Sequence, residues 1–181
     1  MRQAKKEITD QEVLTGLLQA CPVGRLGTRG GDGYPMVKPL NFVYKDGCIY
    51  FHTALAGEKI EDIRRDSRVC FEVDLPVAYV KGDKNPCRAE YLYRSVIIKG
   101  LASLIEDRRE RISALEALMK KYQPEGGYGD FPEEKLKITG VVRIDIECMT
   151  GKEDLGKGAM RERVVGLLAD GMVFPMRLDP D

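Results

Sequence analysis

The sequence lacks an excess of either charge, because 29 lysine and arginine residues balance 29 aspartate and glutamate residues. A DNA-binding surface normally carries a basic excess, so this balance argues against one, although a local basic pocket for one phosphate group is compatible with it. Apolar runs long enough to span a bilayer are also missing. The charged start of the chain, residues 1–7, has no apolar stretch of the kind found in signal peptides. We therefore expect a cytoplasmic protein.

Metal-binding patterns are missing as well. No two cysteines form a C-x-x-C pair, and the single histidine, His52, cannot complete a zinc site of the usual kind. An odd, scattered set of cysteines is typical of buried free thiols in a reducing compartment. We therefore predict no metal site and expect packed, unpaired thiols at all five positions: Cys21, Cys48, Cys70, Cys87 and Cys148.

The pattern of apolar residues favours short antiparallel strands. There is no regular βαβ alternation and no G-x-G-x-x-G element, which excludes a parallel doubly wound sheet and argues against a Rossmann dinucleotide site. A chain of 181 residues, 43% apolar and 32% charged, suits one globular domain with its own core. We predict an α+β, mainly β fold in which peripheral helices cover a barrel.

Local signals place most elements along the chain. Asp46-Gly47 between two β-type runs predicts a tight hairpin, since both central positions of a type I′ turn need positive φ. Thr9 and Glu12 predict a capping box at a helix start, and the helix near residue 60 is expected to turn Ile60 inward and Asp62 outward. A loop is expected over 76–89. The predicted strands cover 23–28, 34–44, 48–53, 69–73, 91–105 and 138–148, and the predicted helices cover 9–20, 56–65, 107–122 and 160–169.

The segment from Tyr50 to Lys59 carries the strongest chemical signal. A strand ends at His52-Thr53 and a helix opens near Gly57, where unpaired N–H groups and a partial positive charge suit a phosphate. Thr53 adds a hydroxyl, Gly57 permits close backbone approach, and Lys59 supplies a charge. These parts predict a phosphomonoester site without a Walker-type loop. The alternative is a plain strand–helix junction with a solvated lysine.

The strand Met36 to Asn41 precedes the hairpin and holds Lys38 between apolar residues. Pro35 and Pro39 leave gaps in the ladder of hydrogen bonds. An isoalloxazine ring, which has its own donors and acceptors, could use the backbone groups that this frees. The alternative is an edge strand that proline and lysine protect from aggregation.

His52 also allows two interpretations. A lone histidine at a strand end is more often a packed, hydrogen-bonded residue than a catalyst. An imidazole also suits proton delivery to a reduced substrate. We favour contact with a cofactor or substrate over acid catalysis.

Several motifs, taken in order, resemble the pyridoxamine 5′-phosphate oxidase-like FMN-binding split barrels, and within them the 5-nitroimidazole resistance (Nim) group. The resemblance covers roughly residues 5 to 155. The motifs that carry it are Tyr34-Pro35, Lys38-Pro39, Asn41-Phe42-Val43-Tyr44, Asp46-Gly47, Ile49-Tyr50-Phe51-His52-Thr53, Gly57-Glu58-Lys59, Val69-Cys70-Phe71, Tyr93-Arg94-Ser95-Val96-Ile97 with Gly100, Leu118-Met119-Lys120-Lys121-Tyr122 and Thr150-Gly151-Lys152.

The resemblance implies a six-stranded antiparallel split β-barrel over residues 1–155 and a homodimer with two FMN molecules in grooves between protomers. Lys38, Lys59 and Thr53 would hold the phosphate, beside Gly57. His52 matches a family histidine near the cofactor, and Ser95 would approach the site from the long strand. Residues 156–181, a C-terminal tail with a weak helix, have no counterpart. The residues expected to face the flavin ring are Met36, Val37, Lys38, Pro39, Leu40 and Asn41.

The function that follows from the resemblance is that of an FMN-dependent oxidoreductase reducing nitroaromatic, 5-nitroimidazole-like compounds. One alternative is a flavin-binding or flavin-sensing module without turnover. Another is a protein that binds haem or deazaflavin on the same barrel. The arginine-rich substrate phosphate site of the pyridoxamine phosphate oxidases proper has no counterpart here, so vitamin B6 synthesis is not expected.

Overall fold

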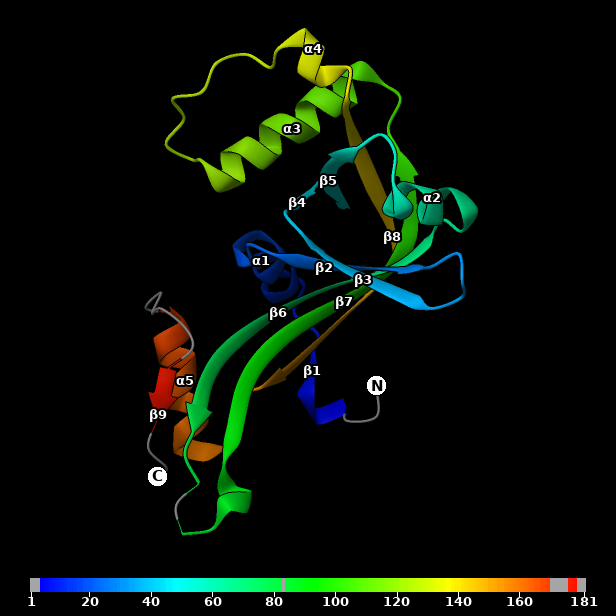
Figure 1. The fold of residues 1–181 in the computed structure, drawn as a ribbon. Coiled ribbons are helices and arrows are strands. Elements are labelled where there is room, and N and C mark those ends of the chain that lie inside the picture. The colour runs from blue at the N-terminus through cyan, green and yellow to red at the C-terminus, as the bar shows by residue number, and fades with distance from the viewer. Residues whose placement is uncertain (1–3, 83, 170–175, 179–181) are drawn as a thin grey trace. The chain divides into compact units, whose positions relative to one another are not determined.

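One β-sheet forms the framework of the fold. The computed structural model describes residues 4–82, 84–169 and 176–178. The strands follow the order β3-β2-β6-β7-β8-β5-β4, with β1 paired to β8 and β9 paired to β6 (Figure 1). The strands are β1 (Glu7–Ile8), β2 (Gly24–Arg29), β3 (Pro35–Leu40), β4 (Val43–Lys45), β5 (Cys48–Ala54), β6 (Arg68–Val80), β7 (Glu90–Leu104), β8 (Thr139–Asp154) and β9 (Met176–Leu178).

Helices connect and flank these strands. The α-helices are α1 (Gln11–Ala20), α2 (Glu58–Arg65), α3 (Arg108–Tyr122), α4 (Glu133–Leu136) and α5 (Gly158–Ala169). Two short 3₁₀ helices are η1 (Ala4–Lys6) and η2 (Pro86–Arg88). No helix within the described residues is long and apolar enough to cross a membrane.

The predicted fold class is confirmed, since the fold is mainly β, with antiparallel strand pairs and peripheral helices. The described strands number nine rather than six, and β3 and β4 stand at the ends of an open order. One reason is that the predicted strand 34–44 is two strands, interrupted at Asn41 and Phe42. There the Phe42 N–H donates to the Tyr122 hydroxyl at 2.9 Å and not to a neighbouring strand. The two-residue β1 and the three-residue β9, which runs parallel to β6, are too short to show a pattern in the sequence.

The chain divides into two compact units. The first comprises the described parts of Met1–Leu17, Asp74–Val96 and Thr150–Asp181, and the second comprises Leu18–Val73 and Ile97–Met149. Strands β6, β7 and β8 contribute residues to both. The predicted tail begins in the first unit, and its residues 170–175 and 179–181 lie outside the described residues. The core of the first unit consists of Val77, Ala78, Val80, Leu92, Leu155, Met160 and Val164.

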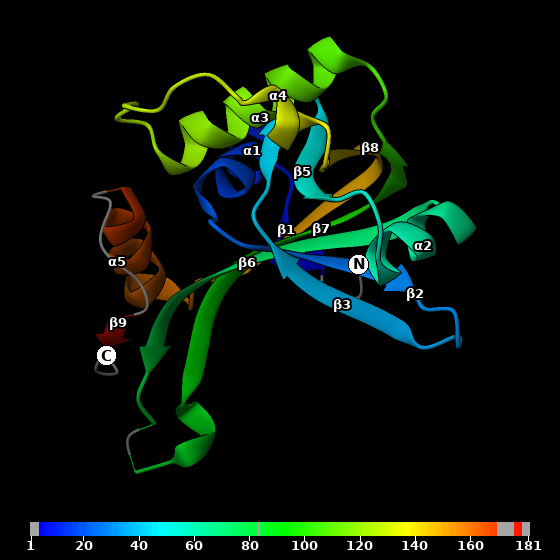
Figure 2. The same cartoon turned by 45° about the horizontal axis from the view of Figure 1, so that its top comes forward.

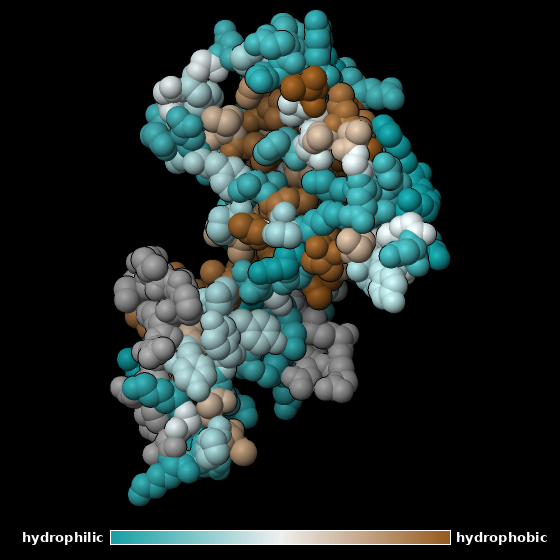
Figure 3. All heavy atoms as spheres, viewed as in Figure 1, coloured by the Kyte–Doolittle hydropathy of each residue, from teal (hydrophilic) through white to brown (hydrophobic). Residues whose placement is uncertain are grey.

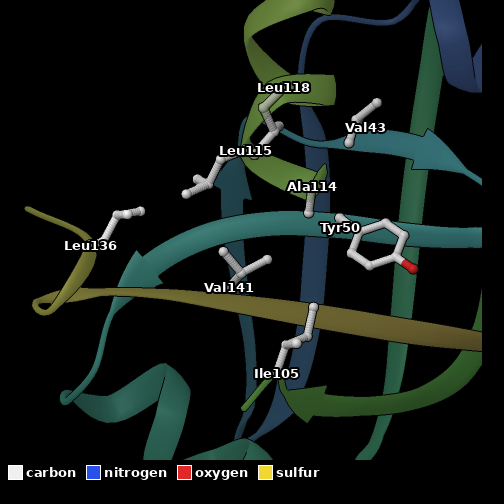
Figure 4. Packing of buried hydrophobic residues seen from close by; sticks show 8 residues of the cluster. All are labelled: Val43, Tyr50, Ile105, Ala114, Leu115, Leu118, Leu136 and Val141. Carbon is white, nitrogen blue, oxygen red and sulfur yellow. The ribbon is translucent and has the colours of Figure 1, made fainter. Parts of the chain in front are cut away.

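The second unit packs α3 against β4, β5 and β8 (Figures 1 and 4). Ala114, Leu115 and Leu118 of α3 point toward strand residues such as Val43 and Val141 (Figure 4). Hydrophobic atoms accordingly gather around α3 and α4 in the upper part of Figure 3. Asp107 caps α3 by accepting from the Glu110 N–H at 2.8 Å, so the predicted helix 107–122 is confirmed. This packing holds in place the face of β5 that points toward α3, and His52 lies on that face.

The hairpin prediction is also confirmed. Lys45 pairs with Cys48, and the two residues between them adopt φ of 51° at Asp46 and 79° at Gly47. Both values are positive, as a type I′ turn requires.

Two local predictions are wrong. Asp10, and not Thr9, caps α1, because its carboxylate accepts from the Glu12 N–H at 2.8 Å. The predicted loop 76–89 is a strand up to Val80, because apolar residues there join the core of the first unit. Residue 83 of that predicted loop lies outside the described residues.

The predicted burial of the cysteines holds for Cys21 alone. All five thiols are free, Cys48 is half-buried, and Cys70, Cys87 and Cys148 are exposed. Cys70 faces solvent because side chains alternate along β6, and its neighbours Val69 and Phe71 take the buried face.

Candidate functional site

Four charged residues meet where β3 lies beside α2, and we call them the lysine cluster: Lys38, Glu58, Lys59 and Asp62. Figure 2 shows α2 next to β2 and β3. Lys38 lies on the half-buried face of β3, and its Nζ is 2.8 Å from Glu58 Oε2 and 3.8 Å from Asp62 Oδ2. The Lys38 ammonium is shielded from solvent and makes no well-oriented hydrogen bond, so its contact with Glu58 is purely an ion pair. The cluster therefore contains a partly desolvated cation.

Asp62 anchors the cluster from inside. Its side chain is only 1% exposed, which corrects the expectation that it points outward. The Thr28 hydroxyl donates to Asp62 Oδ2 at 2.8 Å, and Arg65 Nη1 donates to Oδ1 at 3.0 Å. Burial by itself would raise the pKa of Asp62, but the bonds from Thr28 and Arg65, together with the charge of Lys38, lower it below its ordinary value. Asp62 is thus a buried carboxylate that stays ionised and holds positive charge nearby.

The first turn of α2 opens toward free space. Gly57 precedes the helix with φ of 113°, a value that favours glycine, and no side chain caps the helix. A Cβ added at Gly57 would meet no atom within 4 Å. The intrahelical bonds begin with the N–H groups of Ile60 and Glu61, which both donate to the Gly57 carbonyl. The preceding N–H groups, of Glu58 and Lys59, are the ones that a ligand can use.

Lys59 completes the cluster beside β5. Its ammonium lies 5.2 Å from the centre of the Phe51 ring. Burial lowers the pKa of Lys59, and the positive charge of Lys38 lowers it further, so the two ammonium groups are close enough to repel each other. Thr53 lies two residues after Phe51 on β5 and so shares its face of the strand. Lys38 and Lys59 are thus brought together beside Gly57, and Thr53 lies on the face of β5 that carries Phe51.

His52 lies on the opposite face of β5, in a separate cavity that we call the His52 pocket. This pocket has a volume of ≈ 380 Å³. Its wall is mostly apolar, and the only nitrogen-bearing side chains that line it among the described residues are His52 and Asn41. Tyr122 forms a rigid part of the wall, because its hydroxyl donates to the Pro22 carbonyl at 2.7 Å while it accepts from the Phe42 N–H. The lining residues are Asn41, His52, Leu115, Leu118, Met119, Tyr122 and Phe131.

The residues expected along the flavin ring divide between the faces of β3. Lys38 and Leu40 lie on the half-buried side, whereas Pro39 and Val37, which is 62% exposed, lie on the other. Met36 and Val37 line a broad hollow of ≈ 620 Å³ over β2, β3 and β6. β3 stands at the end of the strand order, so it is an edge strand as one interpretation predicted. This leaves one side of its backbone without a strand partner among the described residues.

Ser95 lies in the first unit, half-buried on β7. All the other predicted site residues lie in the second unit, on β3, on β5, in α2 or in the turns beside these elements.

The roles of Glu58 and Asp62 were not predicted from the sequence. A signal was available in the helix period, since Glu58 and Asp62 are four residues apart and Arg65 follows Asp62 by three. No group of three or more histidine, cysteine, aspartate or glutamate side chains in the described part of the chain is arranged to hold a metal ion.

The lysine cluster has the chemistry of an anion site. Two ammonium groups and an uncapped helix N-terminus together favour a phosphate, and the open space at Gly57 lets it approach the backbone. The residues present therefore fit the phosphate end of a nucleotide-like cofactor.

The fold defines a mainly β protein built on one mostly antiparallel sheet, with a candidate anion site at the start of a short helix. The sequence pattern of the pyridoxamine 5′-phosphate oxidase family matches residues 10–153, and the chain belongs to this family. No curated protein matches the sequence.

Solved structures share the fold. A Bacteroides thetaiotaomicron protein assigned provisionally to 5-nitroimidazole antibiotic resistance is 24% identical, with 81% of this chain and 86% of that chain covered and a TM-score of 0.72. The flavocytochrome Anf3 from Azotobacter vinelandii is 21% identical over 90% of this chain and 77% of that one, with a TM-score of 0.76. A FAD-binding protein from Mesorhizobium loti is 27% identical over 80% of this chain and 95% of that one, with a TM-score of 0.58.

Proposed function

We propose that this chain is a flavoprotein that binds FMN, with the phosphate of FMN at the lysine cluster. The observation that carries the proposal is the convergence of Lys38 and Lys59 at the uncapped start of α2, beside the open space at Gly57. Family membership and a relative described as FAD-binding support a flavin as the cofactor. A phosphomonoester suits this site because it is compact and carries up to two negative charges.

The predicted residues of the second unit have defined parts in the proposal. Lys59, Lys38 and the N–H groups that follow Gly57 bind the phosphate, and Thr53 donates its hydroxyl. The edge backbone of Met36 to Asn41 lies along the flavin ring.

We further propose an oxidoreductase that acts on small aromatic compounds, with nitroaromatic compounds as the first class to test. The bound flavin supplies electron and hydride transfer, and the protein binds and orients the reactants. The His52 pocket supports this proposal, because an apolar cavity with a few polar side chains is typical of small-molecule sites. His52 there would donate a hydrogen bond or a proton to the substrate.

A second candidate function is haem binding. The relative named as a flavocytochrome and the exposed position of His52 at an apolar pocket both favour it. His52 would then be the axial ligand. A flavin sensor without turnover would use the same site, and so would a protein that binds deazaflavin in place of FMN.

We propose a cytoplasmic homodimer as the working form. The hollow over β2, β3 and β6 supports the dimer, because the exposed side chains of Val37 and Cys70 line it together with arginine side chains. Light scattering after size-exclusion chromatography tests the dimer, and a monomer mass at micromolar concentration would contradict it.

The absorption spectrum of the purified protein tests the cofactor first. Flavin bands are expected, whereas a Soret band would favour haem. Titration of the cofactor-free protein with FMN then tests the site. Lys59→Ala should weaken FMN binding about ten- to a hundredfold, because it removes a charge-assisted hydrogen bond. Lys120→Ala, which removes an exposed lysine of α3, is the matched control.

Three results would count against the proposal. A protein without flavin bands that does not bind added FMN would refute it. Equal FMN affinities of the Lys59→Ala and Lys120→Ala variants would refute the phosphate site. Failure of the FMN-loaded protein to accept electrons from NADH or NADPH would favour a sensing role.

A further inference from the structure

Two carboxylates neutralise Lys38, and they differ in how firmly they are held. The side chain of Asp62 is 1% exposed and is also bound by Thr28 and Arg65, so it cannot leave without breaking buried hydrogen bonds. The side chain of Glu58 is 57% exposed, and its ion pair with Lys38 is its only interaction within the described residues. Asp62 is therefore a fixed partner of Lys38, and Glu58 is a releasable one.

The position of Glu58 makes its release inexpensive. Glu58 is the first residue of α2, where a negative charge is favourable whichever way its side chain points, because the helix dipole is positive at that end. The Glu58 carboxylate is the exposed member of the pair, so water solvates it once it leaves Lys38. The Lys38 ammonium, in contrast, is shielded from solvent and has no oriented hydrogen bond. An incoming anion therefore stabilises the Lys38 ammonium by more than the Glu58 carboxylate loses in stabilisation when it leaves.

We propose that Glu58 is a built-in competitor for the anionic ligand of the lysine cluster, and that it is displaced from Lys38 when a phosphate group binds. The inference rests on the proposed function, because it concerns the same phosphate site. In the ligand-free chain the Glu58 carboxylate occupies the position that a phosphate oxygen takes on Lys38. Ligand entry breaks this ion pair while Asp62 keeps Lys38 in place.

This arrangement makes Glu58 a residue that determines specificity. A ligand has to bring more negative charge to Lys38 than a single carboxylate does, so dianionic phosphomonoesters are favoured over ligands without phosphate. FMN and inorganic phosphate belong to the first class, and riboflavin belongs to the second. Removing the charge of Glu58 should strengthen the binding of the first class and leave the second unchanged.

The test compares two isosteric variants of α2. Glu58→Gln removes the competitor, whereas Glu61→Gln removes the same charge from the same helix turn at an exposed residue without an ion pair in the described chain. The dissociation constants of FMN and riboflavin are measured for both variants and the wild type by flavin fluorescence at low ionic strength, and phosphate is measured as a competitor of FMN. FMN should bind Glu58→Gln about two- to fivefold more tightly than Glu61→Gln, with riboflavin equal in all three proteins.

A double-mutant cycle separates competition from a structural effect. In a Lys38→Met background, Glu58→Gln should no longer strengthen FMN binding, because the competitor has lost its cation. Thermal melts of each variant show whether it is folded.

The outcomes are distinct. Equal FMN affinity in the two helix variants, an equal gain for riboflavin, or a gain that persists without Lys38 would each overturn the competitor role and leave the phosphate site intact. Absence of binding of FMN and phosphate to both the wild type and Glu58→Gln would overturn the proposed function, and the competitor role with it.

Discussion

Asp62→Asn tests the internal anchor of the lysine cluster. The substitution keeps the size of the side chain and removes a charge that is 1% exposed. Asp62 accepts two hydrogen bonds, from Thr28 at 2.8 Å and from Arg65 at 3.0 Å. Asparagine can accept from Arg65 with its carbonyl oxygen and donate its amide N–H to the Thr28 hydroxyl, but both contacts then lose the charge of the carboxylate.

The expected loss of stability follows from these contacts. A hydrogen bond to a charged group is worth roughly 1.5–3 kcal/mol and an ordinary one roughly 0.5–1.5 kcal/mol, and the contacts of residue 62 weaken from the first kind toward the second. Arg65 is partly exposed, so solvent regains part of that energy. We therefore expect Asp62→Asn to lower the free energy of unfolding by about 2 kcal/mol, which corresponds to a fall of roughly 4–8 °C in Tm for a chain of this size.

The pH dependence gives a second test of the same residue. The pKa of Asp62 is lower in the folded chain than its ordinary value of 3.8. The contribution of Asp62 is therefore fully present above the pKa of the unfolded chain and is lost as the pH falls through the lower folded pKa. The stability difference between wild type and Asp62→Asn should be constant near neutral pH and should shrink only below about pH 4.

Urea unfolding followed by circular dichroism, at pH 7 and at several acidic values, measures both effects. Glu61→Gln is the control, because Glu61 is exposed on the same helix and should change the unfolding free energy by less than about 0.5 kcal/mol. A loss below about 0.5 kcal/mol for Asp62→Asn, or a difference that stays constant down to pH 2, would refute the assignment of Asp62 as a buried, ionised anchor.

Three further predictions concern the second unit. Burial lowers the pKa of Lys121 from its ordinary value of 10.5 to about 8. Above pH 8 the unfolded chain therefore still binds the Lys121 proton that the folded chain has lost. Stability should therefore rise from pH 8 to 10 in the wild type, and urea unfolding should show a smaller rise in Lys121→Met. Tyr122→Phe removes the hydroxyl that fixes Phe42 and should cost about 1–3 kcal/mol in the same assay; an unchanged midpoint would contradict its anchoring role. Gly100→Ala would place a Cβ 2.2 Å from the Asp145 carbonyl oxygen and should lower Tm by at least several degrees, whereas wild-type melting would show that β7 and β8 separate easily.

Local signals in the sequence determined the fold class and several elements. The Asp46-Gly47 hairpin follows from two residues that tolerate positive φ, and α3 follows from an apolar stripe with a capping aspartate. The order of several motifs indicated the pyridoxamine 5′-phosphate oxidase family, and the match of the family pattern to residues 10–153 confirms it. These features were predictable because each depends on neighbours within one turn or one hairpin.

The composition of the site needed the tertiary structure. His52 and Thr53 are adjacent in the sequence, but a strand turns them to opposite faces, so one faces α3 and the other lies on the Lys59 side. Asp62 looks like an exposed helix residue until β2 packs against α2 and supplies Thr28 as its partner. The pairing of Lys38 with Glu58 joins a strand to a helix twenty residues away. Such contacts depend on how distant elements pack, and local pattern carries no information about that.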